Sequence, residues 1–350
     1  MRDMIRPLFI LRPRRFSATI PAMNSTSNWN LIGHEWAVSL LAGRVAAGRV
    51  SHAHLITGAR GLGKSLLARR LAQAMNCVGD SPPCGVCRPC EHIERNQHPD
   101  LITLEPDGAT IKIEQIRDLQ NGLTLRPNEA RYRVAIILNA DKMTAQSADA
   151  LLKTLEEPPD TSRLILAADV ADGLPQTIAS RCQVMALRPV PIAQLEAELI
   201  ARYGVPVDQA ALLARLSGGR PGWAINAANH PEILALRGER LAAMLDALRA
   251  NRSGRFAYSE SVAAKSDALP ELIDQWRSLW RDVLLLAEGS PVEIVNADLI
   301  DALRDVAYRA GREGARKALK AAHQTADLLD HTNANARLAL DVMLLRMPYL

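Results

Sequence analysis

The sequence predicts an α/β domain built around a phosphate-binding loop, followed by a C-terminal half made of helices alone. First, an apolar segment at residues 53–57 is followed by a glycine-rich loop and a helical pattern at 64–75, the order that a parallel α/β domain requires. Second, the apolar run at 134–138 is continuous, as expected for a strand buried on both faces. Third, apolar residues beyond Pro191 recur at helical spacing only.

The other elements of the α/β part follow in alternation. Strands are expected at residues 53–57, 101–104, 134–138, 164–168 and 183–187. Helices are expected at residues 35–47, 64–75, 114–123 and 145–155. Pro158 and Pro159 stop the last of these helices, because proline lacks the N–H group and its ring clashes with the preceding turn.

Chain length and helix-breaking residues together predict several domains. A chain of 350 residues is longer than a single hydrophobic core usually serves. Prolines close the α/β part near residue 190, and His230-Pro231 marks a boundary inside the helical half. We therefore expect a tail at residues 1–27, an α/β domain at 28–188, a small helical domain at 189–229 and a larger helical domain at 230–350.

The first 22 residues contain five arginines and one aspartate, which account for the whole formal net charge of +4. Because the rest of the chain is formally neutral, net charge excludes a broadly basic nucleic-acid surface but leaves a local basic patch open. The tail has the composition of a transit peptide, yet its apolar run from Pro7 to Leu11 is too short for a signal sequence or a membrane span. We interpret the tail as disordered or as lying upstream of the true start, for which Met23 is a candidate, and we expect a cytoplasmic protein.

Residues 58–65 match the phosphate-loop pattern G-x-x-x-x-G-K-[ST] between a predicted strand and a predicted helix. In such a loop the glycines let main-chain N–H groups face phosphate oxygens, Lys64 adds a cation, and Ser65 can hold Mg²⁺. The expected nucleotide-binding residues are Gly58, Ala59, Arg60, Gly61, Leu62, Gly63, Lys64 and Ser65. A glycine turn with an incidental lysine is the alternative, and it leaves the matched context unexplained.

The acids that ATP hydrolysis requires are missing from their expected place. Hydrolysis needs a carboxylate at the end of a neighbouring apolar strand to hold Mg²⁺, and usually a second one to orient water. Here Leu138 and Asn139 end that strand, and Asp141 lies a few residues further on. We therefore expect ATP or ADP to be bound without hydrolysis; the alternative is a relic loop with no ligand.

Four cysteines lie in the loop after the phosphate-loop helix: Cys77, Cys84, Cys87 and Cys90. Four thiolates complete the tetrahedral shell of a structural zinc site and leave no position open for catalysis. Disulfides are disfavoured in a reducing compartment, and the spacing does not match a zinc finger that enters a DNA groove. We expect zinc to stabilise residues 77–90, and Cys182 to be an ordinary buried thiol.

Three segments carry a resemblance to a known family. They are the cysteine loop after the phosphate-loop helix, residues 149–159 with the sequence DALLKTLEEPP, and Ser180-Arg181-Cys182. With them the chain resembles the delta-prime subunits of the bacterial DNA polymerase III clamp loader, which are members of the AAA+ superfamily. The resemblance extends from about Trp29 to the C-terminus.

The resemblance implies an AAA+ domain with an inserted zinc module, a helical lid, and a C-terminal collar that oligomerises with homologous collars. It implies that Arg181 is an arginine finger, which reaches the γ-phosphate of ATP on a neighbouring tau or gamma subunit. The implied partners are the tau/gamma and delta subunits and, through the complex, the sliding clamp and primer–template DNA. The chain would then be part of the DNA polymerase III holoenzyme without ATPase or polymerase activity of its own.

The sequence departs from the ATPase members of that family in two places. Leu138 and Asn139 replace the metal-binding acids, and Ala168 stands where an ATPase has a polar side chain at the end of a strand. Arg220 lies near the second sensor arginine of the family. Two alternative functions follow: an active ATPase of the tau/gamma type, favoured by the intact phosphate loop, and a zinc-dependent DNA-binding module.

Overall fold

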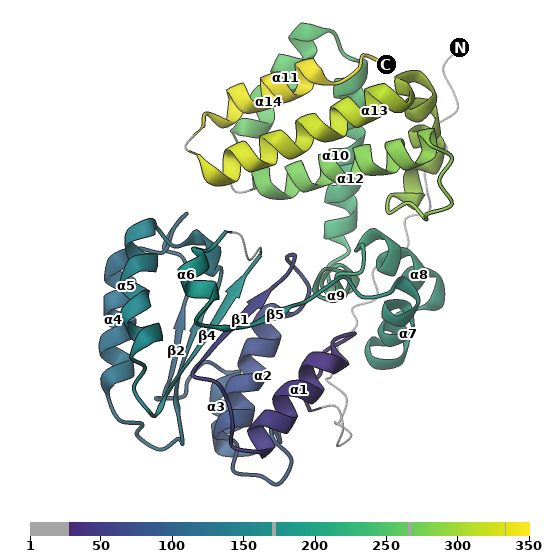
Figure 1. Cartoon of the computed structure of the whole chain (residues 1–350). Coiled ribbons are helices and arrows are strands. Elements are labelled where there is room, and N and C mark those ends of the chain that lie inside the picture. Colours follow the sequence, from purple (N-terminus) through teal and green to yellow (C-terminus); the bar gives the residue numbers. More distant parts are fainter. Residues whose placement is uncertain (1–27, 170–172, 265–267, 333) are drawn as a thin grey trace. The chain divides into compact units, whose positions relative to one another are not determined.

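The computed structural model describes residues 28–169, 173–264, 268–332 and 334–350 (Figure 1). The predicted tail at residues 1–27 lies outside this range. Within the described residues the chain forms two compact units, one of residues 28–210 and 219–225 and the other of residues 211–218 and 226–350. We describe each unit by itself, and the division into three domains stays a prediction.

The first unit is built on a parallel sheet of five strands in the order β2-β3-β4-β1-β5 (Figure 1). The strands are β1 Ala53–Thr57, β2 Leu101–Leu104, β3 Arg133–Ile137, β4 Ser162–Ala168 and β5 Gln183–Ala186. Each of them overlaps a predicted strand. The predicted α/β fold class is confirmed.

Helices cover both faces of this sheet. The helices of the α/β part are α1 Glu35–Ala46, α2 Lys64–Asn76, α3 Arg88–Glu94, α4 Ile113–Thr124, α5 Ala145–Glu156 and α6 Gln176–Ala179. The helices that follow are α7 Ile192–Tyr203, α8 Val207–Leu216 and α9 Pro221–Asn229. The sequence did not predict α3 and α6, because helices of seven and four residues are too short to show a helical period.

Successive residues of each central strand point to opposite faces of the sheet, so the apolar runs serve two cores. Ile56 packs with Leu67 and other residues on the face covered by α1 and α2. Leu55, the preceding residue of β1, packs with Leu151 and other residues on the face covered by α4 and α5 (Figure 1). This two-sided burial is the reason that the strands read as continuous apolar segments.

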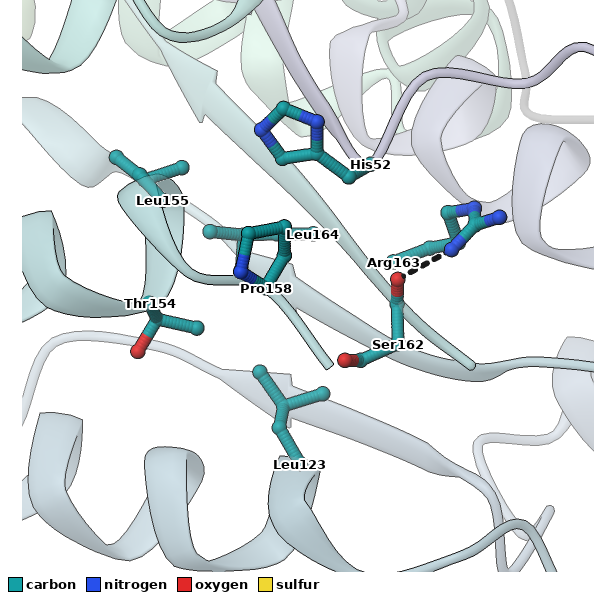
Figure 2. Close-up of a pocket in the computed structure, with 8 residues that line it drawn as sticks. All are labelled: His52, Leu123, Thr154, Leu155, Pro158, Ser162, Arg163 and Leu164. Atoms are coloured by element: carbon teal, nitrogen blue, oxygen red, sulfur yellow. Dashed lines mark hydrogen bonds between the residues drawn. The ribbon is translucent and has the colours of Figure 1, made fainter. Parts of the chain in front are cut away.

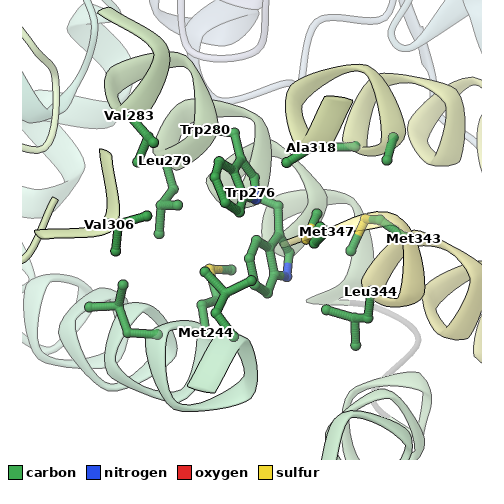
Figure 3. Close-up of a cluster of buried hydrophobic side chains, with 14 of the residues drawn as sticks. Met244, Trp276, Leu279, Trp280, Val283, Val306, Ala318, Met343, Leu344 and Met347 are labelled. Carbon is green, nitrogen blue, oxygen red and sulfur yellow. The ribbon is translucent and has the colours of Figure 1, made fainter. Parts of the chain in front are cut away.

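The second unit contains helices only within its described residues, as predicted. Its main helices are α10 Glu232–Arg249, α11 Arg252–Ala263, α12 Leu269–Ala287, α13 Ile300–His331 and α14 Ala336–Arg346. The fully buried Trp276 and Trp280 of α12 lie at the centre of its core (Figure 3). No helix in the described part of the chain is long and apolar enough to cross a membrane.

A buried arginine fastens the C-terminus to this core. Arg255 of α11 has no exposed surface, and its guanidinium donates hydrogen bonds to the carbonyl oxygens of Leu248, Leu344, Met347 and Pro348. If this side chain were removed, the carbonyls of Leu344 and Leu248 would keep main-chain donors, whereas those of Met347 and Pro348 would lose the donor that Arg255 provides. A buried acceptor without a donor costs about 1–3 kcal/mol.

Arg255→Leu is therefore expected to lower the free energy of unfolding by about 3 kcal/mol, because two carbonyls lose their donor at once and two others lose one of their two donors. Arg252→Leu is the matched control, since Arg252 begins the same helix and is exposed. Urea denaturation followed by circular dichroism measures both variants. Equal midpoints for the two variants would contradict this account of Arg255.

Candidate functional site

The phosphate loop lies between the carboxyl end of β1 and the start of α2. Gly58, Gly61 and Gly63 have φ angles of 138°, 89° and 93°, in the region that disfavours side chains. At Gly58 space is also limiting, since a Cβ atom would lie 2.6 Å from the carbonyl oxygen of Leu187. The loop therefore has the glycine-dependent conformation that the sequence pattern indicates.

Lys64 is held inside this loop by three oxygen atoms. Its Nζ donates to the carbonyl oxygens of Gly58 at 2.5 Å and Ala59 at 3.2 Å, and to Oδ1 of Asp169 at 2.7 Å. The lysine is 8% exposed, so its charge is satisfied within the protein. A nucleotide phosphate has to take the place of the Asp169 carboxylate to reach this ammonium group.

Asp169 is the residue of this site that sequence reasoning missed. It follows the last residue of β4, one position after the Ala168 considered above. Its N–H donates to Oδ1 of Asp141 at 3.1 Å, so the structure places Asp141 beside it. The signal in the sequence was an acid directly after a buried strand, at the edge of the sheet where the phosphate loop lies.

The end of β3 provides no carboxylate. The strand ends at Ile137, the N–H of Leu138 donates to the carbonyl of Leu104, and Asn139 has a left-handed φ of 51°. Neither side chain at positions 138 and 139 is an acid. The nearby carboxylates are those of Asp169, which pairs with Lys64, and of Asp141, which accepts a hydrogen bond from the main-chain N–H of Asp169.

The start of α9 and the residue before it lie directly on the phosphate loop. The N–H of Gly222 donates to the carbonyl oxygen of Gly61 at 2.8 Å. A Cβ at Gly222 would lie 3.0 Å from that oxygen, and a Cβ at Gly61 would lie 3.4 Å from the Cβ of Arg220. Arg220 is therefore next to the loop, near the position that the resemblance implies for a sensor arginine.

The four cysteines of the predicted zinc module come together in space. Their Sγ atoms all lie within 4.8 Å of one another, and those of Cys77 and Cys87 are 3.9 Å apart. Tetrahedral zinc with Zn–S bonds of about 2.3 Å separates its sulfur ligands by about 3.8 Å. The cluster can therefore hold a metal ion of this kind.

Main-chain N–H groups point at the sulfur atoms, but their effect differs between the cysteines, because burial raises the pKa of Cys77 and of Cys90. The N–H groups of Gly79 and Cys84 point at Sγ of Cys77, both at 3.3 Å. Burial opposes ionisation of Cys84, but hydrogen bonds from the N–H groups of Val86 and Cys87 and from neighbouring thiols lower its pKa to about 7. Cys182 lies elsewhere and is half-buried, not fully buried as predicted, and desolvation raises the pKa of its thiol to about 12.

Arg181 lies just before β5 and is held by its own chain. Its Nη2 is 2.6 Å from Oε1 of Glu156, the last residue of α5, and its Nη1 donates to the carbonyl of Thr177 at 2.9 Å. The side chain is 36% exposed. Both contacts lie at the surface, so Arg181 can exchange them for an external anion without disturbing the core.

Arg181 and the phosphate loop lie at opposite edges of the sheet. Strands β1 and β5 are parallel, with Gln183 paired to His54 and Ala186 paired to Thr57. Arg181 precedes the amino ends of these strands, and the loop follows the carboxyl end of β1. A strand of this length separates the two edges by roughly 15 Å, so the guanidinium does not act on a nucleotide in its own loop.

Comparisons with known proteins match this chain to subunits of DNA polymerase III. Residues 33–191 match the family described as DNA polymerase III, delta subunit. DNA polymerase III subunit delta' of Bacillus subtilis is 29% identical over 315 residues, which cover 89% of this chain and 94% of that protein. DNA polymerase III subunit tau of Escherichia coli is 37% identical over 172 residues, 49% of this chain and 27% of that protein.

Among solved structures, a DNA polymerase III gamma subunit-related protein of Thermotoga maritima matches with a TM-score of 0.41 and 16% identity, covering 87% of this chain and 97% of that one. The chain thus spans nearly the whole of its delta' relative and about a quarter of the longer tau relative.

Proposed function

Because the chain is homologous to the delta' and tau/gamma subunits of DNA polymerase III, we propose that it is a clamp-loader subunit that supplies Arg181 to a neighbour and does not hydrolyse ATP itself. The complex would open a sliding clamp and place it on primed DNA. Its direct partners would be tau/gamma and delta subunits, joined through the helical collar.

The position of Arg181 carries this proposal. It is accessible, lies at the edge of the sheet opposite to the chain's own phosphate loop, and is held by one surface ion pair to Glu156. A guanidinium in that position serves a phosphate bound by another subunit. There it offsets the negative charge on the phosphoryl oxygens in the transition state.

The chain's own phosphate loop fits binding without turnover. Leu138 and Asn139 provide no Mg²⁺ ligand at the end of β3, and Lys64 is paired with Asp169. The loop residues Gly58 to Ser65 would hold ATP or ADP through main-chain N–H groups once Lys64 is released. Such a nucleotide would stabilise the contact between the loop and Gly222. Its hydrolysis would not supply energy for clamp loading.

The purified chain is expected to show no ATP turnover above background, because no carboxylate is placed to hold Mg²⁺ at the end of β3. Phosphate release with Mg-ATP measures this directly. Turnover that disappears in Lys64→Ala would instead identify the chain as an active ATPase of the tau/gamma type and would overturn the non-hydrolysing assignment.

Asp169→Ala is expected to tighten ATP binding about fivefold, because the phosphate no longer competes with a carboxylate for Lys64. A partly exposed ion pair of this kind is worth about 1 kcal/mol, and Asp169 is 43% exposed. Calorimetric titration measures the affinity, with Asp118→Ala on α4 as the control. Unchanged or weaker binding in Asp169→Ala would show that this ion pair does not restrict the loop.

A further inference from the structure

The pocket at the start of β4 is too small for a ligand. Leu123, Thr154, Pro158 and Arg163 are among the residues that line it, and its volume is about 10 Å³, room for one water molecule (Figure 2). The four thiols of the cysteine cluster offer a site of another kind. The helix that leads into this cluster, α2, carries polar side chains that are shielded from solvent.

Three polar side chains form one stripe along α2. Arg70, Gln73 and Asn76 are spaced three residues apart, so they point to the same side of the helix. Gln73 and Asn76 are 1% and 4% exposed, and the side chain of Arg70 is 12% exposed. We call these three residues the polar stripe. Burial of such groups is costly unless they are hydrogen-bonded, so their partners indicate what the stripe does.

Gln73 joins α2 to α3 through both ends of its side-chain amide. Its Nε2 donates to the carbonyl oxygen of Cys90 at 2.7 Å and to Oε2 of Glu94 at 3.1 Å. Its Oε1 accepts from Nη1 of Arg70 at 2.6 Å, and the same Nη1 is 2.5 Å from Oε2 of Glu94. Three side chains thus bond one another between the two helices, and one of these bonds reaches the main chain of a cysteine in the cluster.

Helix α3 depends on such contacts for its position. A helix of seven residues is too short to be stable by itself, and Cys90 and Ile93 are its only buried residues. Ile93 packs into the core on the face of the sheet covered by α1 and α2, which fixes α3 at one point. The bond from Gln73 to the carbonyl of Cys90 fixes it at a second point. Two fixed points set the direction of α3 and therefore the place of the Cys90 thiol.

The same stripe fixes the first cysteine of the cluster. Asn76 is the last residue of α2, and Cys77 follows it directly. The side chain of Asn76 accepts from the N–H of Tyr132 and donates to its carbonyl oxygen, both at 2.9 Å. These bonds hold the end of α2 against the segment before β3. Helix α2 therefore places the first and the last cysteine of the cluster, Cys77 and Cys90, whereas the other two lie in the loop between them.

We propose that Gln73 is a positioning residue for the metal site, because it holds Cys90 where its thiolate can meet the other three ligands. A metal ion binds more tightly to ligands that are already in place, since less conformational freedom is lost on binding. Groups that orient metal ligands typically contribute about 10- to 100-fold in affinity. This role does not depend on a nucleotide in the phosphate loop or on a neighbour served by Arg181.

The test compares zinc binding by the full chain and by Gln73→Met, which keeps the length of the side chain and removes its donors and its acceptor. Competition with a chromophoric chelator gives the affinity and the rate of zinc release. Gln73→Met is expected to bind zinc about tenfold more weakly and to release it faster. Gln120→Met serves as the control, because Gln120 joins α4 to α5 in the same way, by donating to the carbonyl of Ala150 at 2.9 Å and to Oγ1 of Thr154 at 2.7 Å.

Metal affinity separates a positioning role from a general loss of stability. Both variants lose hydrogen bonds between helices, so both are expected to melt at a lower temperature, but only Gln73→Met is expected to change zinc affinity. With Co²⁺ in place of zinc, the visible absorption of saturated Gln73→Met is expected to keep the intensity of four thiolate ligands. Loss of a thiolate from this spectrum would mean that α3 unfolds, which contradicts a positioning role. Equal zinc affinities in Gln73→Met and Gln120→Met would overturn the proposal.

Glu94→Ala provides a second test that does not depend on a change in the core. The side chain of Glu94 is 43% exposed and is the acceptor that Arg70 and Gln73 share. Its removal is expected to weaken zinc binding about threefold, the size of a partly exposed ion pair. Glu91→Ala, exposed on the same helix, is expected to leave zinc binding unchanged. Equal zinc affinities in these two variants, or an unchanged chain that binds no zinc, would also overturn the proposal.

Discussion

Arg181→Ala is expected to slow ATP hydrolysis about 1,000-fold at the neighbouring site that this chain serves, the lower end of the range for arginines supplied in trans. The guanidinium is the group that would meet the phosphoryl oxygens, and alanine provides no charge in its place. In the reconstituted loader, rapid-quench experiments measure the initial burst of ATP hydrolysis. The amplitude of this burst is expected to fall by the contribution of one site.

Two features of the structure make this variant interpretable. Arg181 contacts Glu156 and Thr177 at the surface of its own chain, so its loss removes no core packing and assembly is expected to survive. Arg117→Ala, which changes an exposed arginine elsewhere in the same unit, controls for loss of charge. If a complex that contains Arg181→Ala assembles normally and gives a burst of unchanged amplitude, Arg181 is not an arginine finger.

Cys90→Ser is expected to remove bound zinc and to lower the melting temperature of the chain by about 10 °C or more. Structural zinc contributes about 10–16 kcal/mol of apparent binding free energy in small domains, and Cys90 is the fully buried member of the cluster. The carbonyl of Cys90 accepts from Nε2 of Gln73 at 2.7 Å, so the effect is expected to reach α2.

Cys182→Ser is the matched control, because it changes a half-buried thiol outside the cluster. Elemental analysis gives the zinc content per chain, and calorimetry gives the melting temperature. The expected contrast is about one zinc per chain in Cys182→Ser and almost none in Cys90→Ser. Equal zinc contents would mean that the four cysteines do not form the metal site.

Much of the fold was predictable from local patterns. The strands were found because burial on both faces of a sheet leaves continuous apolar runs, such as Arg133–Ile137. The cysteine cluster was also predictable, since four thiols within a short loop can meet without help from the rest of the fold. Helices α3 and α6 were not predicted, because they are too short to show the helical periodicity of apolar residues.

The contacts that define the site were not predictable, because they join residues far apart in the sequence. Lys64 was identified from its motif, but its partner Asp169 lies 105 residues later and depends on β1 and β4 being neighbours. Likewise, Glu156 and Arg181 lie in two recognised motifs, yet nothing in either motif indicates that they pair. Sheet order creates both contacts, and a single sequence does not reveal sheet order.

The most direct test of the central claim is to add this chain to a partner ATPase subunit in rising amounts and measure ATP turnover by that partner. The account predicts that the unchanged chain raises turnover to a plateau, that Arg181→Ala binds the partner equally but does not raise turnover, and that the chain alone is inactive. Equal stimulation by both forms, or turnover by the chain alone, would contradict it.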